Sequence, residues 1–169
     1  VYNGAKWIKD AVESALDQGF TDLELIISDN ASTDETEEVC REFEKRDPRV
    51  RYHRNPTNIG LYRNFDHVFS LAKGKYFKWA ADSDFCLEGF FGKCIDVLES
   101  RPDVVLAYPQ AYLLLIDPDG KEQAMEYFDD FNLQDERPST RFKKYLDRER
   151  INNVMHGIIR ADALRKTSL

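Results

Sequence analysis

The chain has 169 residues, a length typical of a single domain with one hydrophobic core. Hydrophobic residues make up 42% and charged residues 33% of the chain, a composition that excludes general disorder. The formal net charge of -7 disfavours nucleic acid or an anionic membrane as a partner, because both require a clustered positive surface. We therefore expect a folded, soluble domain in which an anionic ligand needs help from a metal ion or a helix terminus.

The cysteines and the apolar runs exclude further classes of protein. Cys40, Cys86 and Cys94 form no CxxC pair and leave an odd count, so neither a disulfide framework nor a thiolate zinc site is indicated. The longest apolar runs are strand-sized, and no basic region followed by an apolar core stands at the N-terminus. We expect a cytoplasmic segment that does not insert into a membrane, whether or not a longer parent protein works at one.

The first two thirds of the chain alternate helical and strand-like patterns. Apolar residues recur at helical spacing over residues 5–16, and residues 23–28 have the composition of a strand covered on both faces. Ser32 with Glu35 predicts a capping box that opens a second helix. The pattern then repeats with a strand over 50–53, a helix over 65–72, a strand over 76–80, a helix over 91–98 and a strand over 104–108.

The last third is less regular. An apolar run over 112–116 is closed by a turn at 117–120, and the polar stretch 121–150 predicts a long functional loop with one helix. A late strand is expected over 155–159, and another helix begins at Ala161. The alternation as a whole predicts the α/β class, with a doubly wound, mostly parallel sheet.

Two acidic segments follow predicted strands. Asp29 ends one strand, and Asp82-Ser83-Asp84 ends another. Asp and Ser are also common at strand ends for turn chemistry alone. However, ligands of open parallel sheets bind beyond the carboxyl ends of the strands, where both segments fall. Carboxylates prefer hard divalent cations, so Mn²⁺ or Mg²⁺ bound together with a diphosphate fits this edge.

Four phrases occur here in an order that resembles family 2 glycosyltransferases, which have a GT-A, Rossmann-like fold. They are residues 1–4 (VYNG), residues 23–36 (LELIISDNASTDET), residues 58–60 (NIG) and residues 76–84 (YFKWAADSD). The ending, residues 156–169, is similar to the segment that follows the acceptor region in such enzymes. The resemblance implies one partial catalytic domain over 1–169, with a nucleotide-sugar-binding part over 1–108 and the start of an acceptor-side part over 109–169.

The resemblance also implies roles for individual residues. Asp29 accepts from the nucleoside base and Tyr2 packs near it, whereas Asp82 lies by the ribose and diphosphate. Asp84 ligates the metal, together with Asp82, because Ser83 replaces the middle acidic residue of the family's motif. The implied donor pocket is completed by Asn3, Asn30, Asn58 and Arg63.

The implied reaction is an inverting, metal-assisted single displacement. A sugar moves from a nucleoside-diphosphate sugar, with UDP as the expected nucleotide, to a hydroxyl of a saccharide or lipid-linked acceptor. In the family, the general base usually lies beyond the segment that matches residues 156–169, so the catalytic base is unknown. Asp129, Asp130 and Glu126 are the fallback candidates. Family members also have a central apolar strand before the Tyr-Asn pair, and its absence would leave ladder groups unpaired.

Three other classes of protein are alternatives to a glycosyltransferase. A catalytically silent nucleotide-sugar-binding module would keep Asp29 and the acidic pair without a base. A phospho-acceptor signalling domain needs a lysine at a late strand end, and neither 104–108 nor 155–159 is followed by one. A dinucleotide-binding dehydrogenase is disfavoured because no GxGxxG follows a strand.

Overall fold

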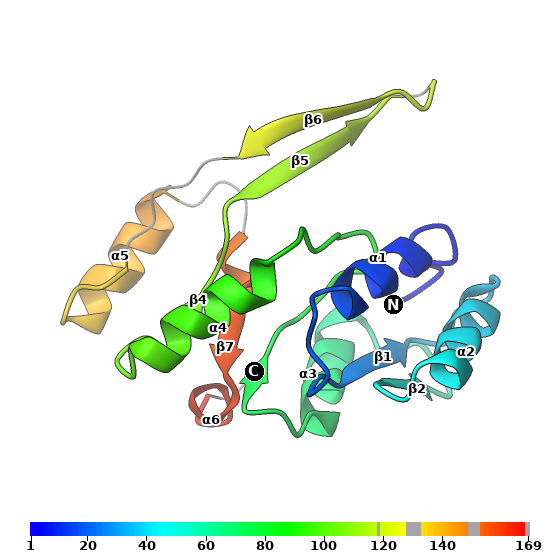
Figure 1. Ribbon diagram of the computed structural model, residues 1–169, viewed down its shortest axis with the longest axis horizontal. Helices are drawn as coiled ribbons and strands as arrows, with labels where there is room; N and C mark the ends of the chain where they lie inside the picture. Colours follow the sequence, from blue (N-terminus) through cyan, green and yellow to red (C-terminus); the bar gives the residue numbers. More distant parts are fainter. Residues whose placement is uncertain (118, 128–132, 149–152, 168–169) are drawn as a thin grey trace. The chain divides into compact units, whose positions relative to one another are not determined.

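The computed structural model describes residues 1–117, 119–127, 133–148 and 153–167, and the chain divides into two compact units (Figure 1). The first unit, Val1–Ala107 with Gly157–Leu169, contains α1 (Ile8–Leu16), β1 (Leu25–Asp29), α2 (Thr36–Arg46), β2 (Val50–Arg54), α3 (Leu61–Leu71), β3 (Tyr76–Phe77), α4 (Phe90–Ser100), β4 (Leu106–Ala107), β7 (Ile158–Arg160) and α6 (Ala161–Leu164). The second unit, Tyr108–His156, contains β5 (Ala111–Ile116), β6 (Glu122–Tyr127), α5 (Pro138–Arg148) and the 3-10 helix η1 (Asn153–His156).

β1 and β2 form the parallel pair that the alternating pattern predicts. Their register runs from Leu25 opposite Val50 to Asp29 opposite Arg54, with α2 as the crossover between them. Apolar side chains of both strands and of the two flanking helices make one hydrophobic core, because each helix turns its apolar stripe toward the sheet. Its buried members are Ile8, Val12, Ile27, Cys40, Phe43, Val50 and Tyr52.

β7 lies between β3 and β4 and pairs antiparallel with both. The expected late strand over 155–159 is therefore misplaced, since residues up to His156 form η1 and the strand begins at Ile158. Ile158 packs in a second core with Phe91 and Leu98, which ties β7 to α4. The position of β7 is fixed by this packing against α4, and no local periodicity in the sequence indicates such a contact. The functional division of the chain at residue 108 stays a prediction.

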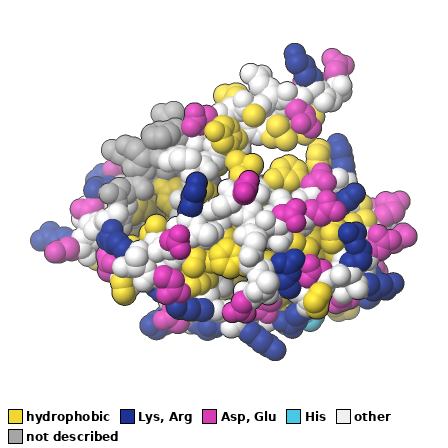
Figure 2. Space-filling view, in the orientation of Figure 1, with side chains coloured by type: hydrophobic (Ala, Val, Ile, Leu, Met, Phe, Trp, Pro, Cys, Tyr) yellow, Lys and Arg dark blue, Asp and Glu magenta, His cyan; other side chains and the backbone are white. Residues whose placement is uncertain are grey.

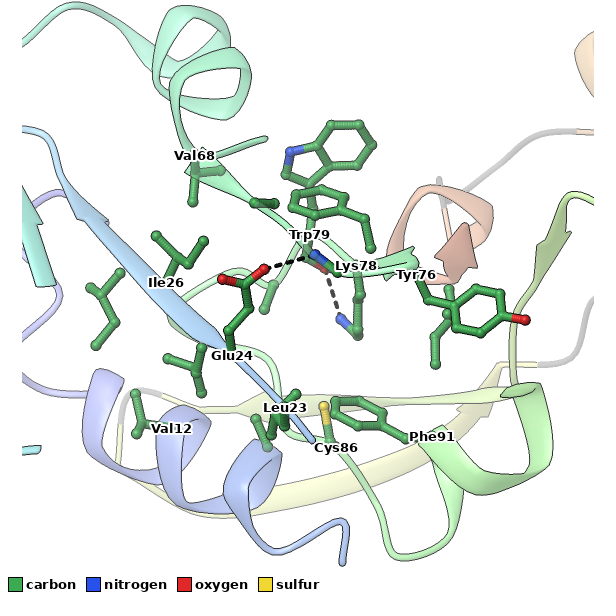
Figure 3. A pocket seen from close by; sticks show the side chains of 18 of the residues that line it. Val12, Leu23, Glu24, Ile26, Val68, Tyr76, Lys78, Trp79, Cys86 and Phe91 are labelled. Atoms are coloured by element: carbon green, nitrogen blue, oxygen red, sulfur yellow. Dashed lines mark hydrogen bonds between the residues drawn. The ribbon is translucent and has the colours of Figure 1, made fainter. Parts of the chain in front are cut away.

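A cavity of about 720 Å³ separates β1 from β3 (Figure 3). Residues 20–28 line it on one side and residues 72–82 on another, while Val12, Val68 and Phe91 add apolar surface from three helices. In the part of the chain that the structure describes, β1–β2 and β3–β7–β4 are separate hydrogen-bonded sheets. Hydrogen bonding between these sheets is thus interrupted at the cavity.

The second unit shows where the interpretation of 121–150 as a loop with one helix is wrong. Residues 122–127 form β6, which pairs antiparallel with β5 along its whole length. The predicted turn is present, because Gly120 N–H donates to Asp117 O and Asp117 N–H donates to Lys121 O. The turn brings two chain segments together, so β6 becomes a strand although it has no apolar alternation of its own. The predicted helix in this stretch is α5.

The predicted capping box of α2 is also wrong. The helix begins at Thr36, and no side-chain bond caps it at Glu35. Asp34 Oδ1 instead accepts the Thr36 N–H at 3.1 Å, and Ser32 Oγ is bound to a distant residue, Asn3. Across the described ranges, no helix combines the length and the apolar character needed to cross a membrane.

Candidate functional site

Asp29, the last residue of β1, is fully buried at the carboxyl end of the parallel pair. Its Oδ1 accepts the Ser32 N–H at 2.8 Å. Its Oδ2 accepts the Tyr52 hydroxyl at 2.6 Å and the Arg54 guanidinium at 2.7 Å. Tyr52 and Arg54 reach the same carboxylate because residues two apart on a strand project from one face, and β2 is paired in register with β1.

This network sets the charge state of Asp29. Burial alone raises the pKa of the carboxyl, but hydrogen bonds from Ser32 and Tyr52 and the charge of Arg54 outweigh it, so the pKa lies below its ordinary 3.8. Burial raises the pKa of Tyr52, and the hydrogen bond to Asp29 raises it further. At neutral pH Asp29 is therefore an ionised acceptor, and Tyr52 is a neutral donor.

The N-terminal loop, residues 1–5, joins the two acidic segments. The Val1 nitrogen donates to Ser28 O at 2.8 Å, and Val1 O accepts the Asn30 N–H at 2.8 Å, which is the pattern of a parallel rung opposite Asp29. At its other end the loop touches Asp82, because a Cβ added to Gly4 would lie 2.1 Å from Asp82 Oδ2. The sequence prediction that both acidic segments meet at one edge is thus realised through this loop.

A cluster of amide side chains lies beside the end of β1. Asn30 donates to Asn58 Oδ1 at 2.8 Å, and its own Oδ1 accepts the Asn55 side-chain N–H at 3.1 Å. Asn55 also donates to Asn64 Oδ1 at 2.9 Å, and Asn64 in turn donates to Ser28 O at 3.0 Å. These bonds fix the loop after β2 against the loop after β1.

The acidic loop, residues 81–86, presents Asp82 half-buried and Asp84 exposed. Among the described residues, no group of three or more His, Cys, Asp or Glu side chains is arranged to hold a metal ion. Mg²⁺ and similar ions are commonly bound by one or two carboxylates plus substrate phosphates rather than by an all-protein cage. The donor chemistry of Asp82 and Asp84 fits that second kind of site.

Gln18, at the end of α1, holds the segment that follows the acidic loop. Its Nε2 donates to Cys86 O at 3.2 Å and to Leu87 O at 3.1 Å, and its Oε1 accepts the Phe91 N–H at 3.2 Å. Ser14, within α1 itself, adds a contact, since its Oγ accepts the Cys86 N–H at 3.0 Å. Sequence reasoning missed these residues, because nothing local marks a glutamine whose partners lie about seventy residues away in the chain.

The remaining predicted site residues are placed as follows. Tyr2 is 50% exposed on the N-terminal loop, and Asn3 Oδ1 accepts the Thr33 N–H at 2.8 Å. Arg63 is exposed on α3, where its neighbour Asn64 is the residue bound into the amide cluster. Glu126 is exposed on β6 of the second unit. Asp129 and Asp130 lie outside the described residues.

The surface charge is mixed. On the face shown in Figure 2, acidic and basic side chains are interspersed and do not gather into a single basic patch.

The sequence matches Glycosyl transferase family 2 over residues 1–169. It is 37% identical to Escherichia coli chondroitin synthase over 106 residues, which is 63% of this chain and 15% of that protein. It is 33% identical to Pasteurella multocida hyaluronan synthase over 126 residues, which is 75% of this chain and 13% of that protein. Streptococcus pneumoniae glycosyltransferase GlyG is 31% identical over 63% of this chain and 36% of its own length. The chain thus spans well under half of each of these relatives.

Solved structures share the fold. S. aureus TarS 1-349 in complex with UDP-GlcNAc matches 98% of this chain and 45% of its own, with a TM-score of 0.67 and 17% identity. The mannosyltransferase PcManGT from Pyrobaculum calidifontis, in complex with GDP-Man and Mn²⁺, matches 63% of this chain and 32% of its own, with a TM-score of 0.57 and 19% identity. At these identities the likeness concerns the fold alone.

Proposed function

The chain belongs to glycosyl transferase family 2, and from this premise we propose that it binds the donor of a sugar-transfer reaction. The donor is a nucleoside-diphosphate sugar, and the acceptor is a hydroxyl of a saccharide or of a lipid-linked acceptor. The observation that supports this most directly is the convergence of the N-terminal loop, the end of β1 and Asp82 at one sheet edge. Ligands of open α/β sheets bind at such an edge.

We propose UDP as the nucleotide. The TarS structures with UDP-GlcNAc and with UDP match 98% of this chain, whereas the structure with GDP-Man matches 63%. The more complete likeness is therefore to a protein that binds a uridine nucleotide.

The proposed contacts to the nucleoside come from the loops around β1. Tyr2 is exposed and free to pack against a base, and Asn3, Asn30 and Asn58 offer amide groups nearby. Asp29 accepts from the base in this proposal. Its carboxylate already accepts hydrogen bonds from Ser32, Tyr52 and Arg54. Because the side chain is 0% exposed, a base must reach it by displacing part of the Arg54 contact.

Asp82 and Asp84 are the proposed ligands of Mn²⁺ or Mg²⁺. When bound, such an ion neutralises charge on the diphosphate leaving group. The chain's own contribution is to hold both carboxylates: Gly4 packs against Asp82, and Gln18 fixes the backbone just after Asp84. Arg63, exposed on α3, is a further proposed contact to the donor.

The proposed chemistry is inversion by a single displacement, in which a carboxylate removes the acceptor's proton. Of the three candidate bases, Glu126 lies among the described residues, where it is exposed and therefore open to solvent and acceptor. A module that binds the donor without turning it over is separated from an enzyme by an assay of donor hydrolysis and transfer.

A thermal-shift screen tests the proposal. UDP, GDP, ADP and CDP are added singly, each with and without Mn²⁺. We expect stabilisation by UDP that increases with Mn²⁺, since a ligand at about 100 times its Kd raises the free energy of unfolding by ~2.7 kcal/mol. A melting temperature that none of the nucleotides changes would contradict donor binding. A larger shift with GDP would overturn the choice of UDP.

A further inference from the structure

The consecutive backbone amides of Asn3, Gly4 and Ala5 are each bound by a different side chain of the loop that enters α2. Asn3 N–H donates to Ser32 Oγ at 2.9 Å, Gly4 N–H donates to Thr36 Oγ1 at 2.9 Å, and Ala5 N–H donates to Asp34 Oδ2 at 3.2 Å. The partners alternate along the sequence Ser32-Thr33-Asp34-Glu35-Thr36. We refer to Ser32, Asp34 and Thr36 together as the amide clamp.

The clamp is itself held by hydrogen bonds. Thr36 is 0% exposed, and its hydroxyl donates to Asp34 Oδ1, so the oxygen's lone pairs are left to accept the Gly4 N–H. Burial opposes ionisation of Asp34, but hydrogen bonds from Thr36 and Ala5 outweigh it and lower the pKa of the carboxyl. At neutral pH the Thr36 hydroxyl is therefore a donor to Asp34 and an acceptor from Gly4, and the Asp34 carboxylate is an acceptor only.

The loop that the clamp holds has an unfavourable backbone conformation. Asn3 has a φ of +53°, and Ala31, next to Ser32, has a φ of +63°. Residues other than glycine persist in this left-handed region only where surrounding contacts enforce it. The clamp supplies such contacts on both loops, and Thr33 N–H adds another by donating to Asn3 Oδ1.

The position of the loop has direct consequences for the proposed donor site. Gly4 lies so close to Asp82 that no Cβ fits between them, and Tyr2 is exposed one residue from the clamped amides. A shift of the loop therefore displaces Tyr2 and Asp82 together. Misplacing a reacting or binding group by about 1 Å can cost ~10²-fold in rate.

We infer that the amide clamp is a set of positioning residues, which fix Tyr2 and Asp82 in the geometry that receives the nucleoside diphosphate. This inference rests on the proposed function of the site. Ser32, Asp34 and Thr36 need not touch the nucleotide, because they act through the backbone of residues 3–5.

Thr36→Val tests the clamp, because valine has nearly the same shape and lacks the hydroxyl. Thr36→Ser keeps the hydroxyl and serves as the conservative rescue. Cys40→Ala, in the buried face of the same helix, is the matched control for a loss of stability without loss of the clamp. UDP with Mn²⁺ is titrated calorimetrically into each folded variant well below its melting temperature. Under those conditions Kd reports the site and not the fraction folded.

We expect Thr36→Val to raise the Kd for UDP at least about tenfold, with Thr36→Ser and Cys40→Ala within about twofold of the wild type. Wild-type affinity in Thr36→Val, or an equal loss in Cys40→Ala, would overturn the inference. Amide hydrogen exchange at residues 3–5 gives a second reading that needs no nucleotide. Protection should fall at least about tenfold in Thr36→Val and persist in Cys40→Ala.

The two readings separate the clamp from the proposed function. Protected amides that lose protection in Thr36→Val, in a protein that binds no nucleoside diphosphate, would contradict the proposed function and leave the clamp standing. Amides of residues 3–5 that exchange freely in the wild type would overturn the clamp, whatever the protein binds.

Discussion

At the scale of single residues, Asp84 separates metal binding from nucleoside binding. It is exposed in the acidic loop, whereas Asp29 is buried at the end of another strand. We expect Asp84→Ala to weaken Mn²⁺ binding in the presence of UDP by more than about tenfold, or ~1.4 kcal/mol, while UDP alone binds as before. Manganese titrations check this. Asp96→Ala, which removes an exposed carboxylate from α4, is the control, and identical titrations for wild type and Asp84→Ala would remove Asp84 from the metal site.

Asp29 gives a prediction about pH. Its folded pKa lies below the ordinary 3.8, so the stabilisation it provides is fully present above that value and is lost as the pH falls through the folded pKa. We expect Asp29→Asn to lower the free energy of unfolding at pH 7 by about 1–3 kcal/mol, because Arg54 loses a charged hydrogen-bond partner. The variant should also show a shallower loss of stability between about pH 5 and pH 2.

Denaturant unfolding across that pH range measures both effects. Asp66→Asn, at an exposed position of α3, is the control, because it makes the same change outside the network around Asp29. A slope for Asp29→Asn as steep as that of the wild type would show that Asp29 does not depend on its buried partners for stability.

Asp29 ends β1, whereas β3 ends at Phe77, before the acidic loop, and the roles of both acidic segments stay predictions. Asp29, Asp82 and Asp84 were predictable as candidates because apolar runs precede them and the family phrases contain them. Arg54, Asn55 and Asn64 were not, because their significance lies in contacts to residues 25, 9 and 36 positions away along the chain. Polar residues of these types are common in loops and helix starts, so only the folded chain distinguishes them.

At the scale of elements, the sequence predicted those whose stability is local. The helical stripes of α1 to α4 and the buried strands β1 and β2 follow from side-chain periodicity, and their ends differ from expectation by a few residues. β6 and β7 were missed or misplaced because each exists through pairing. The residues of β6, EQAMEY, are nearly all exposed, and β7 has three residues held between two other strands.

The Ser32 and Glu35 motif shows how a local rule fails against a distant partner. The spacing fits a capping box, yet Ser32 Oγ accepts the Asn3 N–H from 29 residues away. The first amide of α2, the Thr36 N–H, instead donates to Asp34. The same short stretch therefore starts a helix and fixes the N-terminal loop, and a sequence pattern alone registers only the first of these.

At the scale of the whole molecule, the cavity and the pairing of Val1 with β1 lead to a prediction about a longer chain. Residues added before Val1 and paired parallel with β1 would enter the cavity, where apolar side chains line the walls. We expect a version of the protein with an apolar segment added before Val1 to transfer sugar about 10²-fold faster than this chain. Such a segment would fill the cavity and hold the N-terminal loop in place, and misplacing a reacting group by about 1 Å can cost ~10²-fold in rate.

Transfer turnover with one donor, metal and acceptor compares the two versions. A third version, lengthened at the N-terminus by Ser and Gly residues, controls for length, because polar residues gain little from an apolar cavity. Comparable turnover in the short and the lengthened protein would show that filling the cavity does not order the site.

The hairpin of β5 and β6 has a consequence for the behaviour of the protein in concentrated solution. Tyr112, Leu114, Leu115 and Ile116 are each 41–57% exposed, and hydrophobic side chains are visible at the molecular surface in Figure 2. Within the described residues this sheet has two strands, so each strand has an edge with unpaired backbone groups. Such an edge is a template for strand addition by another molecule. Acidic residues lie at both ends of the apolar run, because Asp117 follows Ile116 and Glu122 and Glu126 pair with Ile116 and Tyr112. Repulsion between these carboxylates in different copies opposes strand addition. Replacing Glu122 and Glu126 by glutamine thus favours self-association through the hairpin.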